Sequence, residues 1–502
     1  MLSGYEFTQH TIQDPIHGGI TFGRIEKALI DHRLFQRLHG LRQNSLLYLI
    51  FSSANHTRFD HSVGVMHLAG KFLDAVLNNQ KKICQAGSSR QSFQDPYRID
   101  DEGVNETFRV LGSDQYFMLL LRMAALFHDI GHGPLSHLFD KFFPTANEIT
   151  AFTRNTEYDF VSPTLATNKS EDADKPVRHE VISCIAATRI ILDCKPEFDR
   201  IGINASSVAR DVCSIIDDRI KPSSLMCAGQ YSAQKLFHDI LSSDLDIDRM
   251  DYLLRDSHMC GVNYGLYDPD RILKSMCSYA RTDTAELRIC VRYSGIGALE
   301  DLLISRYQMH AQIYGHKTNR ACNAMLERIR ERLFDVGWSW YRDCATIEHL
   351  LRTFTDFDDR AFVNELLNPA LDNGVGKISE IASKLFVERK LVKRVFEGRA
   401  NESVSDTARA EATKARLSEH RGRLEREEIW TAEDVFENKG PKINTADYYL
   451  KVLRKNSADG SYLVEELREH STVAHFLPEL ECTFRLFCKE PHVRKAKQLL
   501  PK

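Results

Sequence analysis

Residues Phe127 to Asp140 read FHDIGHGPLSHLFD, and this stretch is the strongest local signal in the sequence. An apolar run leads into it and predicts a helix from Tyr116 to Asp129, which ends in an adjacent His-Asp pair. Two glycines and a proline then break the helix. A second short helix would present His137 and Asp140 at positions i and i+3, so that both side chains lie on one face.

The stretch is rich in side chains that bind metals or transfer protons. Three histidines and two aspartates fall within thirteen residues: His128, Asp129, His132, His137 and Asp140. Imidazole and carboxylate groups side by side are suitable ligands for a divalent cation. The alternative is a histidine-rich helix end with a capping role, but the number of such side chains favours a metal or acid–base site.

A second segment, NHTRFDHSVG at Asn55–Gly64, carries side chains of the same kinds. It offers His61 at the start of a helix, with Arg58 about one turn earlier. Taken alone, His61 would be an ordinary helix-start histidine. Asp60 is the predicted cap of this helix, and the apolar stripe of the helix continues through Val65, Ala69, Phe72 and Val76.

A third segment, IDRMDYLLRD, lies in a predicted helix from Leu245 to Ser257. One face of this helix is polar and carries Asp248, Tyr252 and Asp256, with Arg255 beside them. The opposite face points toward the core and carries Ile247, Met250 and Leu254. Such a polar face is either a solvated surface or part of a binding site.

Other patterned segments complete a mainly α prediction. Helices are predicted after His179 and from Ala298 past Tyr314, and strands at Leu287–Tyr293 and Phe484–Lys489. We expect a helical core over residues 1–350, with a few short strands, and a smaller α+β region over residues 351–502. Polar insertions are expected near residues 79–105 and 144–176, and residues 401–428 form either a solvated helix or a flexible arm.

Composition narrows the class of protein. The chain has 502 residues, of which 43% are hydrophobic and 27% charged, and its net charge of −4 makes no case for a nucleic-acid-binding protein. Its 12 cysteines form no CxxC pair, which favours reduced thiols. The N-terminus shows no signal-peptide pattern, and the most apolar window, Tyr116–Phe127, is shorter than the ~20 residues of a membrane span. We expect a soluble cytoplasmic protein without a membrane segment.

The order H…HD…D built from these segments resembles the HD-domain deoxynucleoside triphosphate triphosphohydrolases, a family that includes the bacterial dGTPases. Four more stretches resemble the family: DPIHGGI at Asp14–Ile20, LFQRLHGLRQ at Leu34–Gln43, YGHK at Tyr314–Lys317 and RLFCKEP at Arg485–Pro491. The likeness covers Asp14 to about Phe396. It implies that residues 1–350 form an HD phosphohydrolase core, and we expect no sterile-alpha-motif module, which some members carry, ahead of Asp14.

The resemblance implies a metal site and a catalytic group. Four residues match the family's ligands for one or two divalent ions of Mn, Mg, Fe or Zn: His61, His128, Asp129 and Asp248. His132, His137 and His179 match histidines around the α-phosphate, and Asp140 matches the carboxylate that orients a catalytic histidine. His137, backed by Asp140, would act as the general acid.

The resemblance also implies contacts with the substrate. Three cations match triphosphate-binding positions, with arginine replacing a lysine in the second: Arg58, Arg249 and Arg306. Tyr252 and Asp256 match residues near the phosphates and the sugar hydroxyl. Gln43 matches a contact with the 3′-hydroxyl, and Tyr314 matches a ring that packs under the sugar.

Two departures from the family pattern bear on specificity and regulation. Asn44 stands where the pattern has leucine against the sugar, and a polar amide there could tolerate a 2′-hydroxyl. His10 and His39 replace basic residues that bind an activating guanine nucleotide, although Asp31 and Gln36 are kept. Activation by GTP is therefore not expected, while another nucleotide activator stays open.

The implied function is metal-dependent hydrolysis of a deoxynucleoside triphosphate to a deoxynucleoside and inorganic triphosphate, by attack at the α-phosphorus. One alternative is an HD-site phosphohydrolase that acts on another nucleotide or on single-stranded nucleic acid. It is favoured by Asn44 and by the basic tail at Lys489, Arg494, Lys495 and Lys497. The other is a non-catalytic nucleotide-binding protein, against which the intact ligand set argues. Family members form dimers, tetramers or hexamers, so a homo-oligomer is expected.

Overall fold

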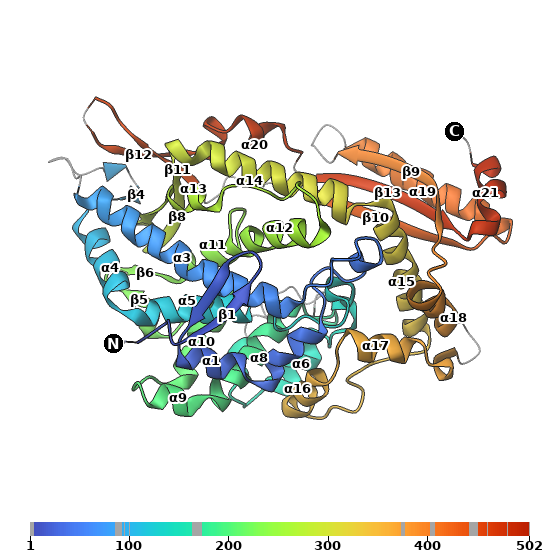
Figure 1. Ribbon diagram of the computed structural model, residues 1–502, viewed down its shortest axis with the longest axis horizontal. Helices are drawn as coiled ribbons and strands as arrows, with labels where there is room; N and C mark the ends of the chain where they lie inside the picture. Colours follow the sequence, from blue (N-terminus) through green and yellow to red (C-terminus); the bar gives the residue numbers. More distant parts are fainter. Residues whose placement is uncertain are drawn as a thin grey trace.

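The computed structural model describes residues 5–85, 93–94, 96–99, 101–162, 173–372, 377–401, 407–440, 450–458, 460–478 and 480–500. It confirms a mainly helical fold with short strands (Figure 1). Among these residues no single helix is long and apolar enough to cross a membrane. One bent pair of helices, Glu102–Ser113 with Gln115–Phe127, is long and apolar enough only when the two helices are taken together.

The core is built around helix α5 (Gln115–Phe127). This helix is buried along almost its whole length, because nearly every side chain from Tyr116 onward is apolar. The main helices around it are α3 (Arg58–Gln85), α8 (His179–Asp193), α10 (Ala205–Ile216) and α11 (Gln234–Leu241). Helix α12 (Ile247–Cys260) packs across α3. The sequence motifs therefore lie at the meeting point of several helices.

Helix α14 (Ile296–Met309) runs along the top of the molecule in Figure 1. It continues into a π-helical turn, His310–Tyr314, and helix α15 (Lys317–Asp335) follows. Turns of this kind are rare and frequently occur at functional sites. Here the turn carries Tyr314, which the sequence assigns to the sugar pocket.

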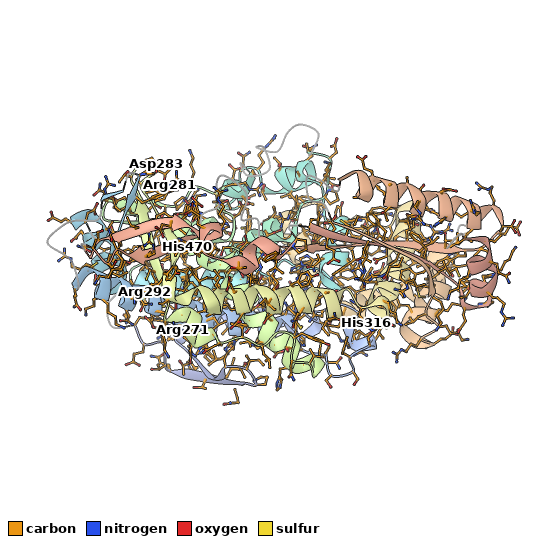
Figure 2. The ribbon with its side chains drawn as sticks, turned by 90° about the horizontal axis from the view of Figure 1, so that it is seen from above. Arg271, Arg281, Asp283, Arg292, His316 and His470 are labelled. Carbon is orange, nitrogen blue, oxygen red and sulfur yellow. The ribbon has the colours of Figure 1, made fainter. Side chains whose placement is uncertain are left out.

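Strands of the described residues form three sheets. β1 (His10–Asp14) and β2 (Gly18–Phe22) form a hairpin. The largest sheet contains the antiparallel pair β7 (Met276–Arg281) and β8 (Glu286–Arg292), and β11 (Lys451–Lys455) joins β8 in parallel, with β12 (Tyr462–Glu466) beyond it. At the β7–β8 turn Arg281 donates to Asp283 at 2.7 Å (Figure 2). The pairing of β11 with β8 connects the C-terminal region to the core.

The third sheet has the antiparallel order β10 (Thr431–Lys439), β13 (Leu480–Cys488), β9 (Lys393–Asn401). Helix α19 (Thr407–Arg426) covers it with an apolar stripe of Ala410, Leu417 and Leu424. This stripe decides between the two interpretations of residues 401–428: the described part is a helix packed on a sheet. Residues 402–406 lie outside the described residues.

The remaining described elements are short. The helices are α1 (Arg24–Ile30), α2 (Arg33–Gln36), α4 (Glu102–Ser113), α6 (Ala146–Thr153), α9 (Lys195–Asp199), α13 (Pro269–Leu273), α16 (Ile347–Thr355), α17 (Asp359–Leu366), α18 (Ile378–Ala382), α20 (Thr472–Phe476) and α21 (Val493–Leu499). The strands are β3 (Phe93–Gln94), β4 (Tyr97–Arg98), β5 (Cys227–Ala228) and β6 (Tyr231–Ser232).

The polar insertions are narrower than predicted. Helix α3 runs on to Gln85, and the buried amide of Asn79 donates to the carbonyls of Leu273 and Met276 at 3.2 and 2.8 Å, so Asn79 belongs to the core. Within residues 144–176 helix α6 forms, with Thr145 as its cap. Residues 86–92 and 163–172 lie outside the described residues. The division of the chain at residue 350 stays a prediction.

Three local predictions are wrong. Asp60 does not cap α3: it lies in the first turn and accepts from the backbone and hydroxyl of Thr57, each at 2.8 Å. His137 and Asp140 lie on two 3₁₀ turns instead of one short α-helix, because Leu135 and Ser136 adopt left-handed φ values of 58° and 59°. On α12 Leu254 was predicted to face the core but is half-buried, and its neighbour Leu253 is buried instead.

Candidate metal centre and active site

The four predicted metal ligands come together from three helices. His61 lies on α3, His128 and Asp129 follow the end of α5, and Asp248 lies in the first turn of α12. His61 Nε2 is 3.0 Å from Asp248 Oδ1 and 3.6 Å from Asp129 Oδ2. His128 Nε2 is 3.7 and 3.5 Å from Oδ1 of the same two carboxylates. Two imidazoles and two carboxylates therefore face one point.

These residues fit a divalent metal ion. Among the described residues, the buried Nε2 atoms of His61 and His128 have no hydrogen-bond partner of good geometry. Burial disfavours the ionised form of Asp248, but its contacts with His128 and His61 outweigh burial and lower its pKa. The site therefore combines imidazole nitrogens with ionised carboxylates, which suits Mn, Mg, Fe or Zn.

His61 also titrates in a way that couples it to metal binding. Burial lowers the pKa of His61, but Asp248 and Asp251 together raise it to about 10. A metal ion bound at Nε2 would have to displace that proton, because only a neutral imidazole is a metal ligand.

Asp251 supports the centre from behind, and sequence reasoning missed it. Its Oδ2 lies 2.8 Å from His61 Nδ1, and its Oδ1 lies 2.7 Å from His17 Nε2. Arg255 donates to both oxygens of Asp251, at 2.8 and 2.9 Å, and also to Asp14 at 2.7 Å. The sequence signals for this network were the second aspartate of IDRMD, which is Asp251, and the DPIH stretch, which contains Asp14 and His17. Only the fold brings these two segments into contact.

A close contact between two elements fixes the His128–Asp129 loop. The Ser183 hydroxyl on α8 donates to the His128 carbonyl at 2.7 Å and accepts from the Gly131 amide at 2.9 Å. A Cβ at residue 131 would come within 2.2 Å of the His179 carbonyl, so only glycine fits there. The loop is therefore tied to the start of α8, which carries His179.

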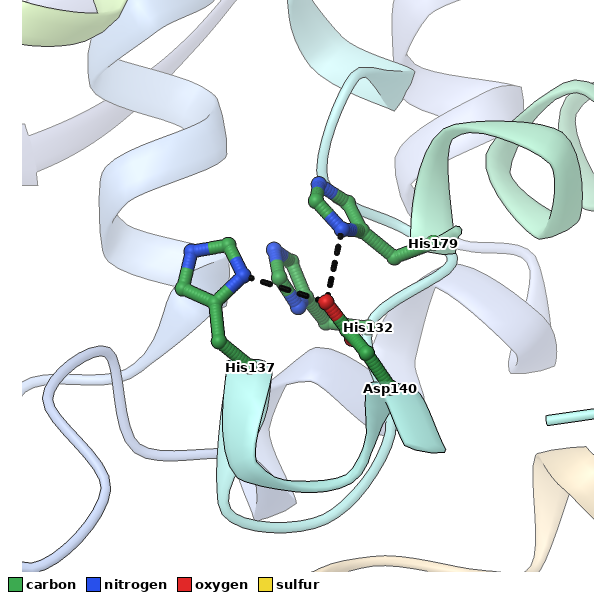
Figure 3. A group of neighbouring side chains, drawn as sticks. All are labelled: His132, His137, Asp140 and His179. Atoms are coloured by element: carbon green, nitrogen blue, oxygen red, sulfur yellow. Dashed lines mark hydrogen bonds and ion pairs between the residues drawn. The ribbon is translucent and has the colours of Figure 1, made fainter. Parts of the chain in front are cut away.

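The predicted catalytic residues form a second cluster beside the metal centre (Figure 3). Asp140 Oδ2 lies 3.4 Å from His137 Nδ1 and 3.5 Å from His179 Nδ1. The rings of His132 and His179 stack with centroids 3.7 Å apart, and His132 Nε2 lies 3.3 Å from Asp129 Oδ1. His137 is the exposed member, with 71% of its side chain accessible. His132 thus stands between the two clusters.

Electrostatics give the members of the second cluster different charges. Burial, Arg58 and His179 lower the pKa of His132 well below its usual value, so this imidazole is neutral. Burial opposes ionisation of Asp140, but its contacts with His137 and His179 outweigh burial and lower its pKa. An ionised carboxylate accepts from the neighbouring imidazole N–H groups and so orients their rings.

Both clusters open into one cavity of about 470 Å³. Its walls include most of the predicted substrate contacts: Gln43, Asn44, Arg58, Tyr252, Asp256 and Tyr314. The Tyr314 hydroxyl donates to Asp256 Oδ2, and His56 Nε2 lies 2.7 Å from Asp256 Oδ1. His56, like Asp251, was not singled out in the sequence, because a single histidine before a helix carries no pattern.

Two residues that were predicted to bind the triphosphate do not line the cavity. Arg249 is absent from the lining and donates to Asp246 at 2.8 Å. Arg306 is buried and is also absent from the lining. Burial, with the charges of Arg306 and Arg249, lowers the pKa of His310 to about 3, and His310 does line the cavity. Their contact with a substrate stays a prediction, whereas Arg58 pairs directly with Asp129, one of the predicted metal ligands.

The positions compared with an activator site lie elsewhere. The His39 ring stacks on Phe59 with centroids 3.7 Å apart, and the Gln36 amide donates to the Ile30 carbonyl at 2.8 Å. Asp31 pairs with Lys27. His10 lies on β1. None of these four residues lines the cavity described above, and their role in activation stays a prediction.

Comparison with known proteins identifies the core. Residues 58–256, which contain every residue of both clusters, match the model of the HD domain. Residues 58–256 are therefore an HD domain. Residues 268–434 match the model of the HD associated region, which in this structure includes α14, α15 and part of the third sheet.

Relatives of this HD-domain protein share its core. It is 28% identical to the uncharacterized protein YwfO of Bacillus subtilis, over 66% of this chain and 58% of YwfO. It is 27% identical to the human deoxynucleoside triphosphate triphosphohydrolase SAMHD1, over 72% of this chain and 51% of SAMHD1. The chain thus spans about half the length of these relatives. A hypothetical protein from Aquifex aeolicus shares the fold, with a TM-score of 0.62 at 23% identity over 98% of this chain and 100% of that one.

Proposed function

We propose that this HD-domain protein hydrolyses deoxynucleoside triphosphates to a deoxynucleoside and inorganic triphosphate. The observation that carries the proposal is the joining of two clusters in one cavity. A set of metal ligands lies next to three histidines and a carboxylate, and His132 contacts the metal ligand Asp129 at 3.3 Å. Phosphoester hydrolysis needs both kinds of group within reach of one phosphorus atom. The likeness to SAMHD1, whose name states this activity, supports the same substrate class.

The metal would be held by His61, His128, Asp129 and Asp248. A divalent ion bound there supplies Lewis-acid polarisation of the phosphate and lowers the pKa of a water ligand. Arg58, which is buried and lines the cavity, adds a fixed positive charge next to Asp129. Such a charge stabilises the negative charge that develops on the phosphate oxygens.

His137 is the proposed general acid. Water attacks the α-phosphorus: its oxygen forms a bond to phosphorus, one of its protons passes to solvent, and the bond between phosphorus and the 5′-oxygen breaks. His137 then gives its proton to that oxygen, so that the nucleoside leaves as an alcohol and the three phosphates leave together. Asp140, 3.4 Å from His137 Nδ1, orients the ring so that Nε2 carries the transferred proton. The exposure of His137 lets its ring reach a bound nucleotide.

The sugar would bind at the end of the cavity that contains Gln43, Asp256 and Tyr314. Gln43 Oε1 is buried and, among the described residues, has no hydrogen-bond partner, so it can accept from a sugar hydroxyl. Tyr314 and His56 hold both oxygens of Asp256. The polar amide of Asn44 lies within 3.4 Å of His56 Nε2. We propose a deoxyribose preference, weakened by Asn44.

Assembly, activation and location are further proposals. We propose a homo-oligomer, as in the family that the sequence resembles, with a nucleotide activator other than GTP as an open possibility. None of the twelve cysteines, all of which lie among the described residues, forms a disulfide. This supports a reducing compartment, and we propose the cytoplasm.

Loss of a metal ligand tests the proposal. His128→Ala should bind metal at least about tenfold more weakly and lose hydrolysis, while keeping its helical circular dichroism. His349→Gln, at an exposed histidine on α16, is the matched control and should keep both properties. Full hydrolysis by His128→Ala with its metal content unchanged would refute the proposed centre.

A further inference from the structure

A second cavity, of about 910 Å³, lies in the C-terminal part of the chain. This C-terminal cavity sits at one end of the third sheet, where β9 and β10 begin and β13 ends: Thr431 pairs with Cys488, and Cys488 pairs with Lys393. Helices α15 and α18, which pack together on the right of Figure 1, form other parts of its wall. Among the described residues it shares no lining side chain with the active-site cavity. Its volume is typical of ligand pockets, which measure about 300–1,000 Å³.

Apolar side chains form a large part of the wall. They come from α15, α18 and the segments next to β9, β10 and β13: Met325, Ile381, Leu391, Val392, Trp430 and Pro491. The protein itself buries Ile381, Leu391 and Trp430 only in part, so some of their apolar surface faces the cavity. A ligand with an apolar body would remove this surface from water, which favours binding.

Positive charge exceeds negative charge in the same wall, which contains five basic and three acidic side chains. Lys384 pairs with Glu380, and Lys377 Nζ lies 3.5 Å from the same carboxylate. Lys489 pairs with no carboxylate among the described residues and lies over the Trp430 ring, 5.6 Å from its centroid. Burial and then the charge of Lys384 lower the pKa of Lys489, against the effect of Glu380. Three ammonium groups thus share one carboxylate, and an anionic group would relieve their repulsion.

We propose that the C-terminal cavity binds an amphipathic organic anion, which has an apolar body and a single carboxylate or phosphate head group. The body lies against Ile381 and Leu391, and the head group is held by Lys384 and Lys489. A nucleoside triphosphate fits this cavity less well, because its charge exceeds the surplus of the wall and its polar sugar and phosphates leave the apolar surface uncovered.

Two elements connect this cavity to the active site. Helix α15 lines both cavities, with Arg320 in the wall of the active-site cavity and Met325 in the wall of the other. β10 contributes Phe436 to the first, and Trp430, the residue before the strand, lines the second. Arg320 donates to Asp434 of β10 at 3.0 Å, which ties the two elements together. A ligand in the C-terminal cavity therefore acts on two walls of the active-site cavity, and it changes hydrolysis; this consequence rests on the proposed function.

Isothermal titration calorimetry of the full chain with dodecanoate tests the binding site. We expect one molecule to bind per chain, and dodecanol, which has the same chain without the charge, to bind at least about tenfold more weakly. Lys384→Gln and Lys489→Gln should each raise the Kd for dodecanoate about tenfold, because a charged partner of the head group is lost. Lys414→Gln, at an exposed lysine of α19, is the matched control and should keep the parent's Kd. Dodecyl phosphate, titrated in parallel, shows which head group the lysines prefer.

Three results would overturn the binding site. They are no binding of dodecanoate or dodecyl phosphate, equal affinity for dodecanoate and dodecanol, and a Kd for dodecanoate that is the same in Lys384→Gln, Lys489→Gln and Lys414→Gln. Binding of dATP that Lys384→Gln weakens as much as it weakens dodecanoate would show a nucleotide site and overturn the ligand class.

An activity arm tests the connection between the cavities. Saturating dodecanoate should change kcat/KM for dATP by about fivefold or more in the parent and in Lys414→Gln. Lys384→Gln should lose this response at the same concentration while keeping its rate without ligand. An unchanged kcat/KM in the parent, with dodecanoate bound, would overturn the connection. Failure to hydrolyse any nucleotide would instead overturn the proposed function, while calorimetry still decides the binding site.

Discussion

His61 Nδ1 lies 2.8 Å from Oδ2 of Asp251, a carboxylate that is buried and is also bound by His17 and Arg255. The contact fixes the ring of His61 so that Nε2 faces Asp129 and Asp248. A carboxylate behind a metal-binding histidine fixes its tautomer and raises its basicity. A layer of charged residues behind the predicted metal ligands therefore holds them in position.

Replacing this carboxylate should weaken metal binding. In Asp251→Asn the shape is kept, but the charge that orients His61 is lost, so metal affinity should fall by about 10–100-fold. Asp239→Asn is the control: Asp239 is also a buried aspartate and pairs with the half-buried Arg288, at 2.7 and 2.9 Å, away from the site. Both variants should lose stability, so a stability measurement does not distinguish them. Metal titration does, because only Asp251→Asn should bind the ion more weakly. Equal metal affinities would contradict the role given to Asp251.

The carboxylate of the second cluster should control the rate of hydrolysis. Asp140→Asn removes the carboxylate charge that orients His137, so kcat should fall by about 10²–10⁴-fold. The metal centre does not include Asp140, so its ion should stay bound. Steady-state kinetics with metal analysis checks this. A kcat within a factor of two of the parent would show that His137 acts without Asp140.

The sugar pocket should respond to changes at Asn44 and Tyr314. Asn44→Leu removes a polar group and should sharpen the preference for dNTPs over NTPs. Tyr314→Ala removes the ring and its bond to Asp256, so the preference should relax. Shape alone rejects an added hydroxyl by only about 10²-fold, so each change should stay within that range. The ratio of kcat/KM for dATP and ATP measures it, and an unmoved ratio in both variants would place the sugar elsewhere.

The buried His310 should make stability fall in mild acid. Its folded pKa of about 3 lies below the value near 6.5 of an unfolded chain. Below pH 6.5 the unfolded state binds a proton that the folded state does not, so this group costs up to about 1.4 kcal/mol per pH unit down to about pH 3. Above pH 6.5 it has no effect. His310→Gln should lose this part of the pH dependence in denaturant unfolding, whereas the exposed His349→Gln should keep it.

The sequence motifs predicted much of the fold and of the site. The helices that carry His61, His179 and Asp248, and the helix that ends just before His128, form where the apolar periodicity predicts them, because one continuous stripe has to face the core. The clustering of imidazole and carboxylate side chains was also predictable from the motifs, whereas their role as metal ligands stays a prediction. Both strands predicted from aromatic and β-branched content are present as β8 and β13.

The remaining features depend on contacts between distant segments. His17 contacts Asp251, and Arg255 connects Asp251 with Asp14, across more than two hundred residues. No local pattern signals such contacts. The turns around His137 require left-handed backbone at Leu135 and Ser136. They are held by Asp359, whose Oδ1 accepts from the Leu135 amide at 2.7 Å. The local sequence predicts a helix here, whereas the contact with the distant carboxylate of Asp359 stabilises two turns instead.

The products of hydrolysis show whether the protein cleaves deoxynucleoside triphosphates at the α-phosphorus. Purified protein is incubated with each dNTP and NTP and with Mn²⁺ or Mg²⁺, and early products are separated by anion-exchange chromatography. We predict a deoxynucleoside and intact inorganic triphosphate in equal amounts, absent in His128→Ala. Release of a nucleoside monophosphate with pyrophosphate, or no turnover of any dNTP with metal bound, would contradict the account.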